Sequence, residues 1–88
     1  MKKVTVKVES QSGLHARPAS MLVAKAQEFK SEIFMEKAGA EINAKSIIGI
    51  LGLGVSFEDE IILTCTGEDE DIAIEAIKKF IEEDLKHQ

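Results

Sequence analysis

Hydrophobic and polar residues alternate strictly along the first segment of the chain. Between Lys3 and Glu9, valine occupies every second position, and lysine, threonine or glutamate occupies the positions between. Alternation that uses β-branched residues is typical of a strand with one buried face. The pattern therefore predicts a half-buried strand over residues 3–9, which ends at a run of polar residues and glycine.

The spacing of the apolar residues changes to a helical period between Ala16 and Phe29. The positions that follow the i, i+3, i+4, i+7 pattern are Ala19, Leu22, Val23 and Ala26. Pro18 fits only in the first turn of such a helix, where its missing N–H would have no partner inside the helix. We therefore expect the helix to begin close to His15.

Three short elements are expected in the middle of the chain. Glu32–Lys37 and Ala40–Asn43 are typical of two strands joined by a turn at Gly39. Ser46 is a favourable N-cap, so a short helix is expected to begin after it. This helix should end at the two glycines that follow its apolar residues, Gly52 and Gly54.

The last part of the chain predicts one strand and one helix. A fourth strand has apolar residues at alternate positions, Ile61, Leu63 and Cys65. We expect Cys65 to be buried and inert, and the acidic run Glu68–Asp71 to be a solvated helix start that the helix dipole favours. The apolar stripe of the final helix consists of Ala73, Ile77, Phe80 and Ile81.

The expected order of elements is β-α-β-β-α-β-α, within a single domain that covers residues 1–88. This order predicts an α+β fold of the open-faced sandwich type. In such a fold, a four-stranded antiparallel sheet is covered by three helices on one side.

Composition and charge exclude several classes of protein. The net charge of −5 disfavours nucleic acid as the main partner, because phosphate binding needs a basic surface. A single cysteine cannot form an internal disulfide, and the N-terminus does not resemble a signal peptide. The longest nearly apolar stretch, Ile47–Val55, is too short to insert into a membrane. We therefore expect a cytoplasmic protein.

The residues around His15 combine features that suit phosphoryl transfer. A histidine at a helix start lies beside unpaired backbone N–H groups and the positive end of the helix dipole, an environment that binds anions. Arg17 adds a planar cation that can contact phosphate oxygens through two bonds. Gly13 allows a close backbone approach, and Pro18 stiffens the turn. Taken alone, a histidine in this position is more often an exposed or capping residue than a functional one.

Two motifs in the chain resemble those of a known family. Gly13-Leu14-His15-Ala16-Arg17-Pro18-Ala19 resembles the active-site motif of HPr, the phosphocarrier of the bacterial phosphoenolpyruvate-dependent sugar phosphotransferase system. Lys45-Ser46-Ile47-Ile48-Gly49 resembles the second signature of that family, around its regulatory serine. The resemblance covers essentially the whole chain in length, element order and motif positions.

The resemblance implies a phosphoryl carrier that works without a cofactor. By this resemblance, enzyme I phosphorylates His15 on Nδ1, and the group then passes to an EIIA domain of a sugar permease. Arg17 would stabilise the phosphoryl group, with help from the backbone N–H groups of Ala16 and Arg17 and the hydroxyl of Ser12. The carrier is expected to be a monomer and to bind no metal, because His15, His87 and Cys65 lack ligand spacing.

A docking surface is expected next to the helix that follows His15. On a helical wheel, Met21 lies nearly opposite the buried stripe of the first helix, so it should be exposed. The short helix presents three apolar residues along one flank, Ile47, Ile48 and Leu51, while Ile50 points elsewhere. The simpler interpretation is ordinary surface apolar residues. The resemblance favours a partner-docking patch, since HPr-like proteins present these two helices to their partners.

Ser46 has two compatible interpretations. As an N-cap it would accept a backbone hydrogen bond and contribute roughly 1 kcal/mol. The resemblance adds regulation: an ATP-dependent HPr kinase/phosphorylase modifies this serine in Gram-positive members, and a catabolite-control transcription factor can read the modified form. A phosphate there would suit a helix N-terminus but would place negative charge beside the docking patch.

Three alternatives remain open from the sequence. One is a paralogue of the same carrier that serves nitrogen or other regulation, although a regulator without carrier function is disfavoured because His15 is present. Another is a ferredoxin-like RNA-binding module, but the expected strands offer only Phe34 for base stacking on an acidic chain. A stand-alone catalyst is disfavoured, because no general base or metal cluster accompanies the histidine.

Overall fold

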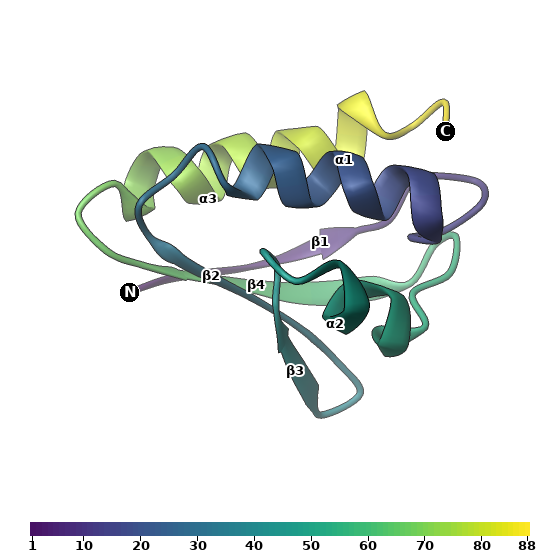
Figure 1. Ribbon diagram of the computed structural model, residues 1–88, viewed down its shortest axis with the longest axis horizontal. Helices are drawn as coiled ribbons and strands as arrows, with labels where there is room; N and C mark the ends of the chain where they lie inside the picture. Colours follow the sequence, from purple (N-terminus) through teal and green to yellow (C-terminus); the bar gives the residue numbers. More distant parts are fainter.

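The computed structural model describes residues 1–88 and contains one antiparallel sheet covered by helices (Figure 1). The strands are β1 (Lys2–Lys7), β2 (Glu32–Lys37), β3 (Ala40–Asn43) and β4 (Glu60–Thr66). The helices are α1 (Ala16–Ala26), α2 (Ile47–Leu53) and α3 (Glu70–Lys79), and a π-helical turn, η1 (Phe80–Asp84), continues α3. The predicted order of elements is confirmed.

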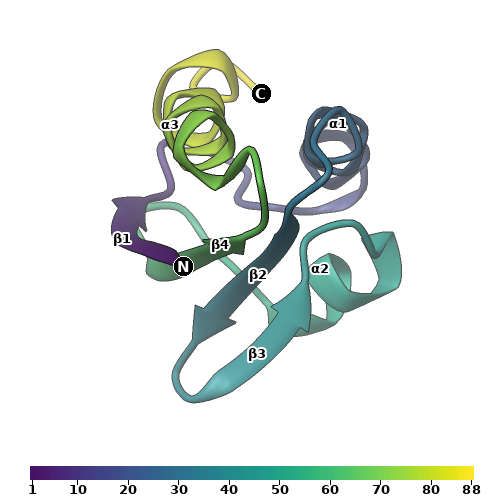
Figure 2. The same ribbon diagram turned by 90° about the vertical axis from the view of Figure 1, so that its left-hand side faces the viewer.

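The strands are arranged in the sheet in the order β1-β4-β2-β3, with every neighbouring pair antiparallel. β1 and β3 form the two edges, and β4 pairs with both β1 and β2. All three helices lie on one face of the sheet, and the other face is uncovered (Figure 2). The open-faced α+β sandwich is therefore confirmed.

The core lies between the sheet and the helices, and aliphatic side chains fill it. One continuous cluster of 19 buried residues includes Val6 and Val8 from the N-terminal segment, Ile33 and Met35 from β2, and Leu22 from α1. Of the predicted stripe of α1, Ala19, Leu22 and Ala26 are buried, and Val23 is half-buried. Binary patterning thus identified which side of each element faces the core.

The ends of three predicted elements differ from the structure. β1 covers Lys2–Lys7 rather than residues 3–9. α1 ends at Ala26 rather than at Phe29, because a turn over residues 27–28 redirects the chain toward β2. The final helix does not stay α-helical to its end: Leu85 N donates to Phe80 O at 2.9 Å, the wider spacing of a π turn. Phe80 is consequently half-buried, while Ile81 and Leu85 are fully buried.

The prediction that the acidic run Glu68–Asp71 is only a solvated helix start is wrong for Asp69. The Asp69 carboxylate accepts hydrogen bonds from Lys30 N at 2.9 Å, from Ser31 N at 2.9 Å and from the Ser31 hydroxyl. These bonds, led by that of the Ser31 hydroxyl, hold the pKa of Asp69 below its usual value. The partners lie 38 and 39 residues away in sequence, so helical periodicity could not have indicated the contact.

No helix combines the length and the apolar character that a membrane crossing requires.

Candidate functional site

His15 is the N-cap of α1, as the position of Pro18 predicted. Its backbone is extended (φ −90°, ψ −166°), and its carbonyl accepts the first bond of the helix, from Ala19 N at 2.9 Å. The imidazole makes no capping bond and is exposed. The ring is therefore accessible to another protein.

The backbone around His15 offers unpaired hydrogen-bond donors. The amides of His15, Ala16 and Arg17 donate to no acceptor within the chain. Such free N–H groups at a helix start, together with the positive end of the dipole, form an anion-binding environment. The first turn contains no acidic residue that would compete for these donors.

Arg17 lies in the same first turn, and its side chain is exposed. It takes part in none of the ion pairs of the chain, although most of the basic residues do. A guanidinium that is not already held by a carboxylate can form a two-bond contact with a phosphoryl group. The structure thus brings a nucleophile, a cation and backbone donors together at one helix start.

The loop that precedes His15 is held by its backbone. Leu14 N donates to Val55 O at 3.0 Å, and Gly13 N donates to Ser10 O at 2.9 Å. Gly13 has φ +71°, and a Cβ atom there would lie 2.4 Å from Val55 O. Glycine is required at this position both by the backbone conformation and by the approach of the neighbouring loop.

Ser12 lies on this loop with an exposed side chain, 3.4 Å from the buried hydroxyl of Ser10. The Ser10 hydroxyl is itself within hydrogen-bond distance of Gly13 O, at 3.0 Å, and of Gln88 O, at 3.1 Å. Ser10 therefore anchors the loop, and Ser12 remains on the side that solvent reaches. Sequence reasoning missed Ser10, since a polar residue in a loop gives no signal that it is buried.

Ser46 is the N-cap of α2, as predicted. Its side-chain oxygen accepts a hydrogen bond from Gly49 N at 3.1 Å, and its side chain is exposed. The far end of α2 is closed by Gly54 in the left-handed conformation, with φ +69°. Ser46 is thus both a structural cap and a hydroxyl that a modifying protein could reach.

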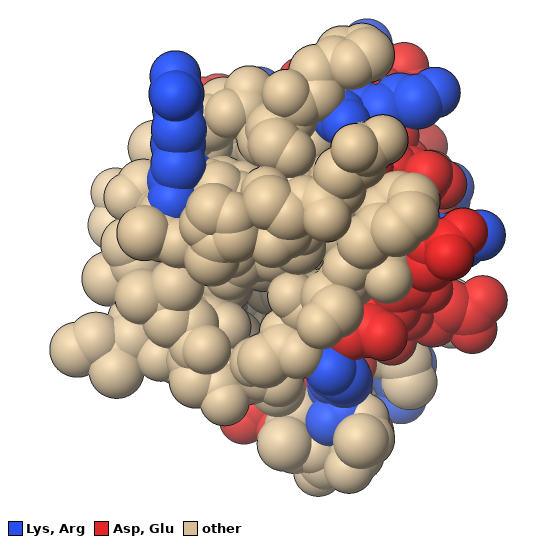
Figure 3. Space-filling model, turned by 90° about the vertical axis from the view of Figure 1, so that its right-hand side faces the viewer, with Lys and Arg blue, Asp and Glu red and all other residues tan.

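The apolar residues of α2 divide as the helical wheel predicted. Ile50 is fully buried, whereas Ile47, Ile48 and Leu51 are 37%, 81% and 42% exposed. α2 packs beside α1, so these residues lie on the helix next to the one that His15 caps. The end of the molecule that carries the start of α1 and the end of α2 shows a largely uncharged surface, with acidic side chains gathered along one side (Figure 3).

Met21 differs from its expected exposure. It is half-buried and packs against the core cluster. α1 packs against α2, α3 and η1, so more of its surface is shielded than the single stripe that the wheel assumes. Of the four predicted docking residues, Met21 is therefore the least exposed.

Cys65 is fully buried on β4, as expected. Burial, reinforced by the nearby charges of Asp69 and Glu70, raises the pKa of its thiol to about 11. The thiol stays protonated at neutral pH and is a poor nucleophile or metal ligand. No group of three or more potential metal-ligating side chains exists in the chain.

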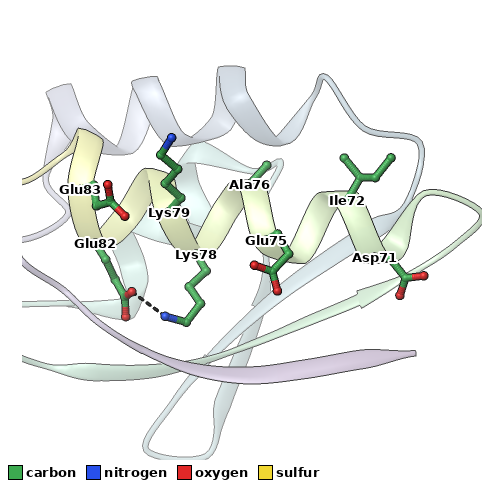
Figure 4. Close-up of a pocket in the computed structure, with 8 residues that line it drawn as sticks. All are labelled: Asp71, Ile72, Glu75, Ala76, Lys78, Lys79, Glu82 and Glu83. Atoms are coloured by element: carbon green, nitrogen blue, oxygen red, sulfur yellow. Dashed lines mark hydrogen bonds and ion pairs between the residues drawn. The ribbon is translucent and has the colours of Figure 1, made fainter.

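The larger of the two surface depressions lies away from His15. It runs along the outer side of α3 and η1, where Glu75 and the Lys78–Glu82 ion pair line it (Figure 4). It contains no residue of the His15 loop, of α1 or of α2. The exposed helix start at His15 therefore lies outside both depressions.

Phe57 is an exposed aromatic residue near this site that sequence reasoning did not single out. It is 42% exposed and follows directly after the segment Val55–Ser56 that contacts Gly13. The available signal was an aromatic residue flanked directly by Ser56, Glu58 and Asp59.

Comparison with known proteins gives consistent results over almost the whole chain. A family model described as "PTS HPr component phosphorylation site" matches residues 2–83. The phosphocarrier protein HPr of Mycoplasma pneumoniae is 44% identical over 89 residues, covering 100% of this chain and 98% of its own. The HPr-like protein Crh of Bacillus subtilis is 42% identical over 80 residues, covering 91% and 94%.

Solved structures agree with these matches. A crystal structure of HPr from Thermoanaerobacter tengcongensis has a TM-score of 0.94 and 43% identity, covering 100% of this chain and 99% of its own. A crystal structure of an HPr dimer from the same organism has a TM-score of 0.76 and 45% identity, covering 97% and 98%. The relatives thus include carriers called HPr, an HPr-like protein and a dimeric form.

Proposed function

This chain belongs to the HPr family of phosphocarrier proteins of the phosphotransferase system, and we propose that it carries the phosphoryl group on His15 in the sugar-uptake branch. The family membership makes it a carrier that acts with partner enzymes and not a catalyst by itself. In this proposal, enzyme I donates the phosphoryl group and EIIA domains of sugar permeases accept it. The observation that carries the proposal is the exposed imidazole of His15 beside unpaired amides and a free guanidinium.

The geometry supports the following transfer step. The lone pair of His15 Nδ1 attacks the phosphorus of the donor's phosphohistidine, forming a new N–P bond while the donor's N–P bond breaks and its electron pair returns to the donor ring. Negative charge on the three phosphoryl oxygens is stabilised by the amides of Ala16 and Arg17 and by the Arg17 guanidinium. The Ser12 hydroxyl adds a further donor from the loop. No metal or cofactor takes part, and the reverse sequence passes the group to the acceptor.

Ser46 supports a second, regulatory role in the same proposal. Its hydroxyl is exposed at the start of α2, next to exposed Ile47 and Ile48. An HPr kinase/phosphorylase would phosphorylate it, and the added charge would weaken docking at this surface without unfolding α2. A catabolite-control transcription factor would be the reader of that form.

A regulatory or nitrogen-branch paralogue is the alternative within the family, since one of the matching relatives is the HPr-like protein Crh. The intact His15–Arg17 pair favours the carrier. We propose that the chain acts as a cytoplasmic monomer; the dimeric relative makes sedimentation analysis the appropriate check.

The decisive experiment is incubation with phosphoenolpyruvate and enzyme I, followed by mass measurement. We expect the mass of one phosphoryl group, lost in acid and retained in base, as for a phosphoramidate. His15→Ala should abolish it, and the matched control His87→Ala should not, because His87 lies on the C-terminal turn outside the site. Phosphorylation that persists in His15→Ala, or none in the parent protein, would refute the proposal. Transfer to EIIA then separates the sugar branch from the paralogue.

A further inference from the structure

Phe57 is the most unusual apolar residue on the surface near His15. The other three phenylalanines, Phe29, Phe34 and Phe80, are half-buried, whereas Phe57 is exposed. It lies in the loop that joins α2 to β4. Phe57 belongs neither to the exposed flank of α2 (Ile47, Ile48 and Leu51) nor to the residues proposed to contact the phosphoryl group, so its exposure needs a separate explanation.

The loop that carries Phe57 is fixed by its neighbours. The Asp59 carboxylate accepts from Ser56 N at 2.8 Å and pairs with Lys37 Nζ at 2.7 Å. Lys37 Nζ also donates to Gly54 O at 2.6 Å. These contacts from β2 clamp both ends of the loop, and the bond from the Lys37 ammonium holds the pKa of Asp59 below its usual value.

The N-terminal segment holds the same loop from the other side. Val8 N donates to Asp59 O at 2.9 Å, and Glu58 N donates to Val8 O at 2.8 Å. Glu58 adopts φ +71°, a conformation that non-glycine residues rarely adopt unless the surroundings impose it. Phe57 is therefore presented from a rigid turn, so little backbone entropy would be lost when a partner covers it.

The turn lies beside the His15 loop. The backbone contact between Gly13 and Ser56, with the spacing of consecutive Cα atoms, limits the distance between the Cα atoms of His15 and Phe57 to about 16 Å. Both segments lie at the end of the molecule that shows the largely uncharged surface (Figure 3). The neighbouring charges of Glu58 and Asp59 are paired with Lys7 and Lys37.

A protein that docks over His15 can reach this region. A typical partner buries about 800 Å² on each side, which corresponds to a disc of roughly 16 Å radius. The whole molecule measures only 32 × 25 × 20 Å. A footprint of this radius centred on His15 is large enough to include Phe57, and aromatic residues in such positions contribute strongly to binding.

We propose that Phe57 is a docking residue for the protein that donates the phosphoryl group to His15. It inserts into an apolar depression on the donor and so fixes the orientation in which the two histidines meet. This inference rests on the proposed function. The partner is the donor, because the donor must bring its phosphohistidine to His15, whose Cα atom lies within about 16 Å of that of Phe57.

The test compares Phe57→Ala with Ile72→Ala, which removes an equally apolar side chain that is 67% exposed on α3. We expect Phe57→Ala to lower kcat/KM for phosphorylation by phospho-enzyme I about tenfold through a higher KM, and Ile72→Ala to leave it unchanged. The rate at saturating enzyme I should stay close to that of the parent. Phe57→Lys should lower kcat/KM further, since a charge would have to be desolvated.

Three outcomes would overturn the inference. The first is a parent that is phosphorylated normally while Phe57→Ala behaves like Ile72→Ala. The second is a loss in kcat at saturation with KM unchanged, and the third is a loss confined to transfer toward EIIA. Rates are normalised to the final amount of phosphorylated carrier, so partial unfolding cannot imitate weak docking. Failure of the parent to accept any phosphate would instead refute the proposed function.

Discussion

Replacing Ile48 and Ile50 by alanine separates docking from folding within a single short helix. The two residues are identical in type and lie two positions apart on α2, but Ile48 is 81% exposed and Ile50 is fully buried. The same chemical change is therefore made once on the surface and once in the core. If the exposed flank of α2 is a docking patch, Ile48→Ala should lose partner binding and Ile50→Ala should lose folding stability.

The exposed fraction sets the size of the expected effects. Full burial of an isoleucine side chain is worth about 1.5–3 kcal/mol. With 81% of it still exposed, Ile48 can contribute at most about 1.2–2.4 kcal/mol when a partner covers it. That corresponds to a loss of roughly 8- to 60-fold in affinity for Ile48→Ala. Folding stability should be unchanged or slightly higher, since alanine has the better helix propensity.

Ile50→Ala should show the reverse behaviour. Removing a fully buried isoleucine from a packed core costs about 2–5 kcal/mol. In a domain of this size, that loss lowers the melting temperature by roughly 8 °C or more. The fraction that stays folded should bind enzyme I with nearly the affinity of the parent, because Ile50 does not reach the surface.

The assays are thermal melting and calorimetric titration with enzyme I, for both variants and the parent. Ile48→Glu extends the series, since a buried carboxylate should weaken binding beyond the alanine variant. The reasoning is refuted if Ile48→Ala melts well below the parent, which would make it a core residue. It is refuted equally if Ile48→Ala and Ile48→Glu both bind with the affinity of the parent.

Three further changes test separate features of the structure. Ser46→Asp should melt at or above the parent temperature, because an anion at the start of α2 stabilises the helix by about 0.3–1 kcal/mol. It should nevertheless accept phosphate more slowly than Ser46→Ala at low enzyme I concentration. Equal transfer rates for the two variants would mean that Ser46 is only a helix cap. Asp69→Asn should melt below the parent near neutral pH, and melting curves measured at decreasing pH should show this difference shrinking. The lowered pKa of Asp69 contributes stability at pH values above its unfolded-state pKa of about 3.9, and this stability is lost as the pH falls through its folded-state pKa. Cys65, buried and with its pKa raised to about 11, should react with a thiol reagent at neutral pH only after denaturation, and rapid reaction of the native protein would contradict its burial.

The sequence by itself determined the elements and the position of His15 at the start of α1. Alternating valines defined β1, and the position of Pro18 placed the start of α1 at His15 because proline is tolerated only in the first turn. Ser46 was identified as an N-cap for a similar reason, since only a few side chains can accept a hydrogen bond from the third amide of a helix. These features depend on residues close together in the chain, so local stereochemistry was enough to predict them.

Only the tertiary structure decided which contacts join distant segments. Met21 is half-buried because α1 packs against α2, α3 and η1, and a helical wheel assumes a single buried side. Asp69 holds Ser31 across 38 residues, and Lys37 clamps the loop that presents Phe57. Such bonds form between groups that only the strand order β1-β4-β2-β3 and the helix packing bring together. Periodicity records which side of an element is apolar, whereas the partner on that side is set by how the elements assemble.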